Sequence, residues 1–173
     1  EENYPFRGSG VKILSLSQLI KKYPDKIYDI EIKQGDPPIS EDLCILLREY
    51  GIASDQAIVA SFYDDIINQF HDACPEVAIS LSSNKGTKLY ILSRLGLERL
   101  LPLQSVIAQL PLKFSTPLGE LKLDKRYINA FSKGDRQVWV WTINDSSKMK
   151  EVLKIGAHGI LTDRPDILMD VIQ

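Results

Sequence analysis

Residues 137–165 constrain the fold of this chain more than any other stretch, because they read as a complete strand, helix and strand. Residues 138–143 are β-branched or aromatic without polar alternation, which is typical of a strand buried on both faces of a parallel sheet. Residues 144–146 offer helix-capping side chains, and Gly156 stands where a helix can end in the left-handed conformation. A second short strand is predicted at 159–161.

The connection between two such strands is right-handed in nearly all known cases, and it makes the strands run parallel. The polar residues at their ends, 142–144 and 162–164, are therefore expected at one edge of the sheet. That edge is where α/β proteins place their binding and catalytic groups. We therefore expect functional side chains there.

The alternation of strands and helices extends over the whole chain. Six strands are predicted, near residues 30, 59, 79, 114, 140 and 160, and each is followed by a helical segment. Between them, residues 89–110 are largely apolar and predict a helix that stops at Pro102 and resumes at Ser105, ahead of a strand at 112–115. Such alternation predicts an α/β fold, either an open doubly wound sheet or a closed (β/α)8 barrel. A glycine-rich phosphate loop, which would favour the open sheet, is missing because Gly35 stands alone.

Composition and charge narrow the classes of function. The chain has 173 residues, 44% hydrophobic and 25% charged, as expected of one globular domain. No apolar run approaches the roughly 20 residues that a transmembrane segment needs. A net charge of -2 and a pI near 5.7 argue against a nucleic-acid partner, since such domains usually carry a basic excess.

The two cysteines and two histidines give no catalytic or metal-binding motif. Cys44 and Cys74 lie among apolar helical residues without CxxC spacing, so we interpret them as two buried thiols, which leaves the compartment open. His71 falls in the last turn of a predicted helix, where its charge suits the helix dipole. His158 precedes a strand, at the edge opposite the polar ends. Neither is expected to act as a catalyst, which also argues against a Ser-His-Asp arrangement.

Four short segments have a recognisable combined pattern. They are Ile-Glu-Ile-Lys at 30–33, Ser-Phe at 61–62, Val-Trp-Val-Trp-Thr-Ile-Asn at 138–144 and Gly-Ile-Leu-Thr-Asp-Arg-Pro at 159–165. In this order they resemble strands of the glycerophosphodiester phosphodiesterase family, the last two being similar to the final two strands of its barrel. The resemblance spans residues 5–170 and is weakest between 83 and 130.

This resemblance implies a TIM (β/α)8 barrel, but the sequence departs from the family pattern. The family's His-Arg-Gly segment, its Glu-x-Asp metal pair and a second His-Asp lie upstream of the Ile-Glu-Ile-Lys strand, and none of them precedes residues 30–33 here. We therefore expect residues 1–173 to form a single partial barrel domain with about six of the eight β/α units, lacking the N-terminal two strands. A missing N-terminal segment or a partner chain is expected to complete the barrel, because open strand edges promote aggregation.

The resemblance also implies roles for three residues. Glu31 is expected to bind a divalent metal, Ca²⁺ or Mg²⁺, through its carboxylate, with an ion pair to Lys33 as the structural alternative. Lys33 is expected to offset phosphate charge in the transition state, unless it is simply an exposed strand-end lysine. Trp141 is expected to pack on the glycerol or alcohol part of a substrate, unless it belongs to the core. No catalytic residue is expected in this chain.

Four further residues near these segments are given other interpretations. Trp139 is expected to point outward to the helices. Asn144 and Asp163 are interpreted as helix caps, and Arg164 as a candidate contact for an anion.

The activity that the resemblance implies is metal-assisted hydrolysis of glycerophosphodiesters to sn-glycerol 3-phosphate and an alcohol. Two histidines would act as general acid and base. Because this chain lacks them, we expect it to be inactive unless complemented. Two alternatives stay open: a catalytically inactive barrel fragment that serves as a binding or structural module, and a relative of the phosphatidylinositol-type phospholipases.

Overall fold

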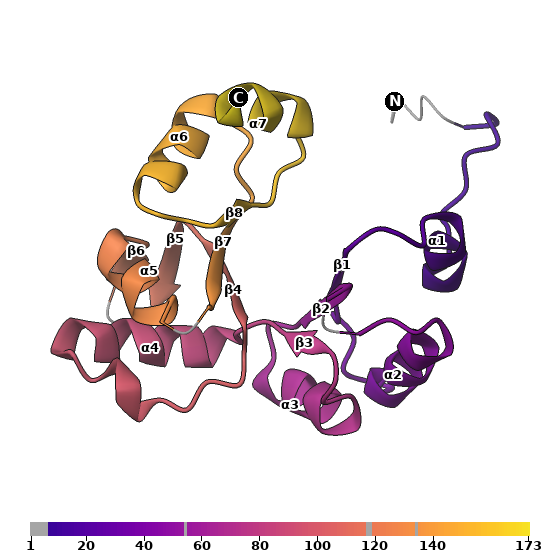
Figure 1. Cartoon of the computed structure of the whole chain (residues 1–173), viewed down its shortest axis with the longest axis horizontal. Coiled ribbons are helices and arrows are strands. Elements are labelled where there is room, and N and C mark those ends of the chain that lie inside the picture. The colour runs from indigo at the N-terminus through magenta and orange to yellow at the C-terminus, as the bar shows by residue number, and fades with distance from the viewer. Residues whose placement is uncertain (1–6, 54, 117–118, 134) are drawn as a thin grey trace.

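The computed structural model describes residues 7–173 apart from 54, 117, 118 and 134, with the backbone alone at 115 and 116. Its main feature is a set of six parallel strands. They are β1 (Tyr28–Glu31), β2 (Ala57–Ala60), β3 (Ala78–Ile79), β4 (Ile107–Pro111), β7 (Gln137–Trp141) and β8 (Gly159–Ile160). Figure 1 shows them on the inside of an open arc, with the helices along its outside.

Two three-stranded sheets make up this set, in the orders β1-β2-β3 and β4-β7-β8. An isolated parallel bridge between Ser80 and Ile107 joins them. Beside it, the Leu81 N–H donates to the Ile107 carbonyl at 2.7 Å and the Val106 N–H donates to the Ile79 carbonyl at 3.3 Å. The strands therefore follow one continuous parallel order, β1-β2-β3-β4-β7-β8.

Helices follow or precede these strands in the alternation that the sequence predicts. They are α1 (Leu16–Lys22), α2 (Ser40–Glu49), α3 (Asp64–Ala73), α4 (Ser83–Leu95), α5 (Lys125–Phe131), α6 (Ser146–Lys154) and α7 (Pro165–Ile172), with a short 3-10 helix, η1 (Glu98–Leu100). Ser15, Asp124 and Asp145 cap α1, α5 and α6 through side-chain oxygens that accept backbone N–H groups. Gly156, with φ of 98°, follows α6 as expected, in a conformation that favours glycine.

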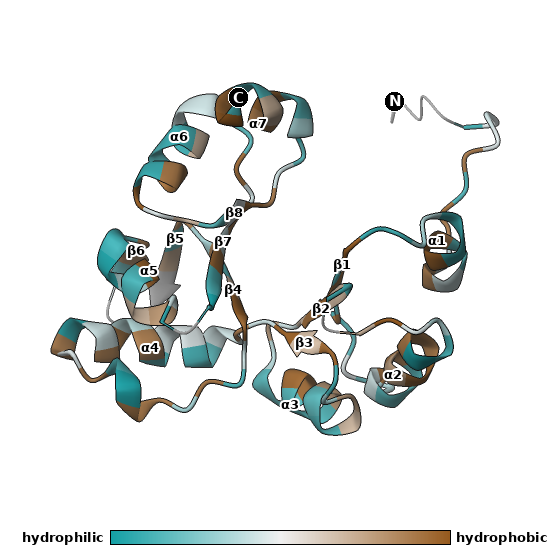
Figure 2. Cartoon of the chain, viewed as in Figure 1, coloured by the Kyte–Doolittle hydropathy of each residue, from teal (hydrophilic) through white to brown (hydrophobic). Residues whose placement is uncertain are grey.

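The core lies between the strands and the helices, in two clusters. One contains Val59 of β2 with Leu47 of α2 and Phe70 of α3, and the other contains Val138 and Val140 of β7 with residues of α5 and α6. Helices α2, α3, α4 and α6 each contain both apolar and polar residues (Figure 2), as helices with one buried face do. Side chains alternate between the two faces of a strand. The strand residues next to those in the core clusters therefore point to the inner face of the arc.

Trp139 corrects one prediction. It lies two residues from Trp141 on β7, so both indoles belong to the inner face, whereas Val138 and Val140 are fully buried toward the helices. The Trp139 ring packs directly on Gly159 of β8, where a Cβ atom would lie 2.7 Å from its Cδ1. Glycine is required at 159 for this close approach.

The fourth parallel strand is a second correction. It occupies Ile107–Pro111, where the sequence predicted a resumed helix, while the stretch predicted as a strand at 112–115 belongs to an antiparallel hairpin. The hairpin consists of β5 (Lys113–Thr116) and β6 (Gly119–Lys122). Ile107 and Ala108 are buried between β7 and the bridge at Ser80, a position that only an extended segment can fill.

The cysteines give a third correction. Cys44 of α2 and Cys74, at the end of α3, form a disulfide with a Cα–Cα distance of 5.5 Å, so they are not a pair of free thiols. The bond joins two helices that pack side by side on the same core cluster. No described helix is both long and apolar enough to cross a membrane.

Candidate active site

A cavity of about 590 Å³ opens on the inner face of the arc, at the carboxyl ends of the strands. Side chains from β1, β4, β7 and the segments that follow β2, β3 and β8 all contribute to its wall. The three residues that the sequence singles out, Glu31, Lys33 and Trp141, all line it. The polar strand ends 142–144 and 162–164 share one edge as expected, since the Asn144 amide oxygen accepts hydrogen bonds from the Thr162 hydroxyl and the Asp163 N–H.

One side of the cavity is charged and comes from β1 and the residues just after it. Glu31 ends β1, and its carboxylate oxygen Oε2 lies 3.3 Å from the Lys33 ammonium. The Glu31 side chain is 34% exposed and that of Lys33 is 78% exposed, so the pair is open to solvent and contributes little to stability. Both groups can therefore rearrange around a ligand at low energetic cost.

Asp29 adds a second carboxylate to this side. It shares the face of Glu31 on β1, and it accepts a hydrogen bond of 2.7 Å from the Gln109 amide of β4, on the far side of β2 and β3. Partial desolvation raises the pKa of the Asp29 carboxyl, with a further rise from the charge of Glu31, while the hydrogen bond from Gln109 opposes the shift. Sequence reasoning missed both residues, although the two-residue spacing to Glu31 was a usable signal for Asp29.

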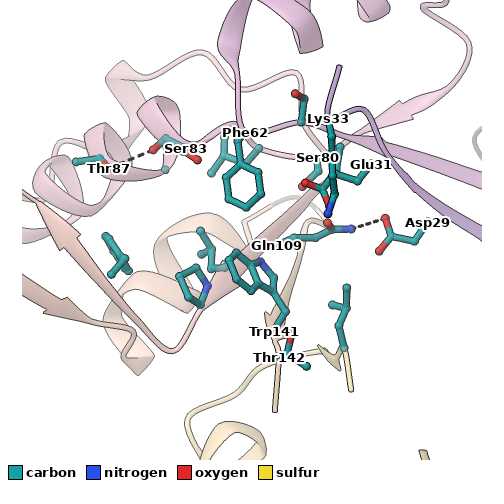
Figure 3. Close-up of a pocket in the computed structure, with 18 residues that line it drawn as sticks. Asp29, Glu31, Lys33, Phe62, Ser80, Ser83, Thr87, Gln109, Trp141 and Thr142 are labelled. Carbon is teal, nitrogen blue, oxygen red and sulfur yellow. Dashed lines mark hydrogen bonds and ion pairs between the residues drawn. The ribbon is translucent and has the colours of Figure 1, made fainter. Parts of the chain in front are cut away.

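The other side of the cavity is apolar. Trp141, at the end of β7, meets the ring of Phe62 edge to face with centroids 5.8 Å apart. Ser61, which precedes Phe62, donates a buried hydrogen bond of 2.9 Å to the Ile32 carbonyl and so fixes the end of β2 against β1. Figure 3 shows the two rings beside the group formed by Glu31, Lys33, Asp29 and Gln109.

A group of hydrogen bonds joins the segments that follow β7 and β8. The Asn144 amide oxygen accepts from the Thr162 hydroxyl and from the Asp163 N–H, each at 2.9 Å, and its amide nitrogen donates to the Asp163 carboxylate. Asn144 and Asp163 are therefore not helix caps as predicted, because Asp145 caps α6 and Arg164 precedes α7. Arg164 forms an ion pair with Asp166, outside the cavity wall.

Neither histidine lines the cavity. His71 lies in the last turn of α3, and His158 lies just before β8, where its ring nitrogen Nδ1 accepts the Val138 N–H at 3.2 Å. That neither histidine acts as a catalyst stays a prediction.

Within the described residues, only one group of three or more potential metal-ligating side chains has its donor atoms close together, and it is Cys44, Cys74 and Glu76. Two of its members are already joined in the disulfide. The cavity offers the carboxylates of Asp29 and Glu31, oxygen donors of the kind that Ca²⁺ and Mg²⁺ prefer, but fewer than these ions usually require.

Comparison with known proteins decides the family. The model of the glycerophosphoryl diester phosphodiesterase family matches residues 1–167. This chain belongs to that family. Metal dependence is general among its members.

Two curated proteins are similar to this chain over most of its length. Lysophospholipase D GDPD3 of Homo sapiens is 24% identical over 93% of this chain and 56% of its own length. A glycerophosphodiester phosphodiesterase of Caldanaerobacter subterraneus is 23% identical over 95% of this chain and 64% of its own length. The chain thus spans about three fifths of the length of these relatives.

Solved structures of the family have the same fold. A glycerophosphoryl diester phosphodiesterase domain from Mycobacterium tuberculosis has a TM-score of 0.73 at 18% identity, covering 99% of this chain and 67% of that one. An Oleispira antarctica phosphodiesterase, solved in complex with the product sn-glycerol 3-phosphate, has a TM-score of 0.63 at 16% identity, covering 91% of this chain and 60% of that one. The fold of this family member is therefore α/β and TIM-barrel-like.

Proposed function

We propose that this chain forms part of an enzyme that hydrolyses glycerophosphodiesters to sn-glycerol 3-phosphate and an alcohol, with a divalent metal. The observation that carries the proposal is the meeting of Glu31, Lys33 and Trp141 in one cavity of a chain that matches the family over residues 1–167. The neighbour with bound sn-glycerol 3-phosphate supports the choice of product class.

Glu31 is the proposed metal ligand. Its carboxylate is partly exposed in the cavity and has only the exposed Lys33 ammonium as an ion-pair partner within the described chain. Ca²⁺ or Mg²⁺ held there would polarise a phosphoryl oxygen of the substrate. The other ligands are proposed to come from Asp29 or from groups outside the described residues, since the cavity holds only these two carboxylates.

Lys33 and Trp141 are the proposed substrate contacts. The Lys33 ammonium is well exposed and can turn from Glu31 toward a phosphate, where it would stabilise the negative charge that develops in the transition state. Trp141 presents its ring to the cavity, held by the edge-to-face contact with Phe62, and would pack against the glycerol or alcohol part of the substrate.

The general acid and base are proposed to come from elsewhere, because His71 and His158 both lie away from the cavity. The outer strands of the described set, β1 and β8, each have one neighbour, β2 and β7 respectively. A closed barrel gives every strand two neighbours. We infer that the six β/α units are completed by two further strands, supplied by another segment or by a partner chain.

The direct test is hydrolysis of glycerophosphocholine by the purified 173-residue chain, with sn-glycerol 3-phosphate measured by a coupled assay. We expect no turnover by the chain alone. Once a segment that carries the acid and base completes the barrel, we expect turnover that depends on Mg²⁺ or Ca²⁺. Turnover by the chain alone would show that its own residues supply the acid and base.

The open strand edges have their own test, which is the molar mass in solution by light scattering. Unpaired edges β1 and β8 promote association, so the chain alone is expected in species larger than 19.5 kDa. A soluble monomer of 19.5 kDa would contradict the need for completing strands.

A second candidate function is a binding module without catalysis. The absence of both histidines from the cavity wall favours it. A chain that binds sn-glycerol 3-phosphate but gives no turnover after completion of the barrel would support this alternative.

A further inference from the structure

We propose that Phe114 determines the specificity of the cavity, and that it selects phosphodiesters whose alcohol carries an apolar segment. The inference rests on the phosphodiesterase function proposed above and adds a class of leaving group to it. It concerns the side of the cavity opposite the Glu31 carboxylate.

Phe114 is carried by the β5–β6 hairpin, which is not one of the parallel strands. The hairpin begins directly after β4, and the Leu123 N–H closes its base by donating to the Leu112 carbonyl at 2.9 Å. The ion pair between Lys122 and Glu151 of α6, at 2.7 Å, ties its second strand to the outer layer. These contacts fix the hairpin beside the cavity.

The Phe114 ring is held in position by an aromatic stack. It meets the Tyr90 ring of α4 edge to face, with centroids 5.7 Å apart, and Tyr90 packs at 5.9 Å on Tyr127, which is fully buried. The Arg94 guanidinium lies over the Tyr90 ring, 4.2 Å from its centroid. The adjacent Lys113 is exposed on the opposite face of the hairpin and does not line the cavity.

Phe114 extends the apolar wall that Phe62 and Trp141 begin, and Leu110 and Pro111 of β4 lie in the same wall. The wall is built on β2, β4 and β7, which have a neighbour on both sides through the sheet pairings and the Ser80 bridge. It therefore does not depend on the open edges at β1 and β8. The charged residues, by contrast, come from the edge strand β1.

A cavity with this division suits a substrate that is charged at one end and apolar at the other. The phosphodiester would lie at the charged side near Lys33, and the alcohol would extend along Phe62, Trp141 and Phe114. A fully buried methylene group raises affinity by about fourfold, whereas a polyol such as glycerol gains little from an apolar wall. The preferred alcohol therefore contains an alkyl chain.

The test is a calorimetric binding series with n-alkyl phosphates from butyl to octyl in the presence of Mg²⁺. The wild-type chain is expected to bind octyl phosphate at least about tenfold more tightly than butyl phosphate. This ratio is smaller than the one that full burial of four methylene groups would give. Phe114→Ala is expected to lower that ratio by about threefold or more, and Phe114→Leu, which keeps an apolar side chain, to lower it less.

Lys113→Ala is the matched control, since it removes an exposed hairpin residue outside the cavity and is expected to keep the wild-type ratio. A wild-type ratio near one, or the same ratio in wild type, Phe114→Ala and Phe114→Leu, would overturn the proposal. Thermal unfolding identifies a variant that fails to fold, and Phe114→Leu then carries the comparison. Because binding is the readout, a completed barrel that gives no turnover would refute the proposed function and leave this result intact.

Discussion

Trp141 and Trp139 lie two residues apart on β7 and differ in what they reach. Trp141 lines the cavity against Phe62, whereas Trp139 packs on Gly159 away from the cavity wall. Trp141→Leu is therefore expected to weaken binding of sn-glycerol 3-phosphate by roughly three- to tenfold, since it removes the aromatic face. Trp139→Leu is the control, and calorimetry should find it close to wild type. Equal losses in both variants would rule out a specific role for Trp141.

The Asp29 carboxyl makes the stability of the fold depend on pH. The pKa of its carboxyl is raised in the folded protein above its ordinary value of 3.8, so the folded state holds more protons than the unfolded state in the pH interval just above 3.8. Stability contributed by this residue is thus highest at low pH and is lost as pH rises through the folded pKa. Asp29→Asn keeps an acceptor for Gln109 and removes the negative charge.

Because Asp29 is exposed to solvent, which screens its charge, we expect Asp29→Asn to raise Tm by only about a degree at pH 7 and to have little effect near pH 3.5. Asp170→Asn, at an exposed position of α7, serves as the control for a general change in net charge. Thermal unfolding followed by circular dichroism at the two pH values measures both. A lower Tm for Asp29→Asn at pH 7 would show that the charge of Asp29 stabilises the fold.

Single residues of the site could be predicted from sequence where a local pattern fixed their direction. The period of two along a strand places Glu31 and Lys33 together, and the same rule identifies Asp29 and corrects Trp139. Gln109 and Phe114 could not be found in this way, because their partners Asp29 and Tyr90 are distant in the sequence. Contacts of this kind appear only when the strands are assembled.

At the scale of elements, the disulfide between α2 and α3 leads to a stability prediction. Cys44 and Cys74 are 30 residues apart, so the bond closes a loop that would otherwise be free in the unfolded chain. Reduction is expected to lower the free energy of unfolding by roughly 2–4 kcal/mol. Urea unfolding with and without reductant measures this difference, and the double variant Cys44→Ala/Cys74→Ala should be insensitive to reductant. Identical curves for the wild-type chain would contradict the cross-link.

The disulfide and the fourth parallel strand could not be predicted from the local sequence. The cysteines carry no spacing signal, and their pairing depends on how α2 packs beside α3. Ile107–Pro111 is a short apolar run within a longer one, and such runs fit a buried strand or a buried helix equally well. The strand is selected by its parallel pairing with β7 and by the bridge to Ser80, neither of which is local.

At the scale of the whole molecule, the alternation of strands and helices was enough to predict a parallel α/β fold. The match to the glycerophosphoryl diester phosphodiesterase family and the solved structures agree with the TIM-barrel-like form of that prediction. The curvature that brings β1 close to β4 was not in the local sequence pattern. It is visible in the hydrogen bond between Asp29 and Gln109, which crosses the inner face of the arc.

We propose that the carboxylate of Glu31 and the ring of Trp141 form one wall of a metal-dependent phosphodiester site. The decisive measurement is calorimetric titration of the completed barrel with sn-glycerol 3-phosphate, in Mg²⁺ and in EDTA, for wild type and for Glu31→Gln. Wild type is expected to bind at least about tenfold more strongly with Mg²⁺, and Glu31→Gln is expected to show no such gain. Equal binding by wild type in Mg²⁺ and in EDTA, or a full Mg²⁺ effect in Glu31→Gln, would refute this site.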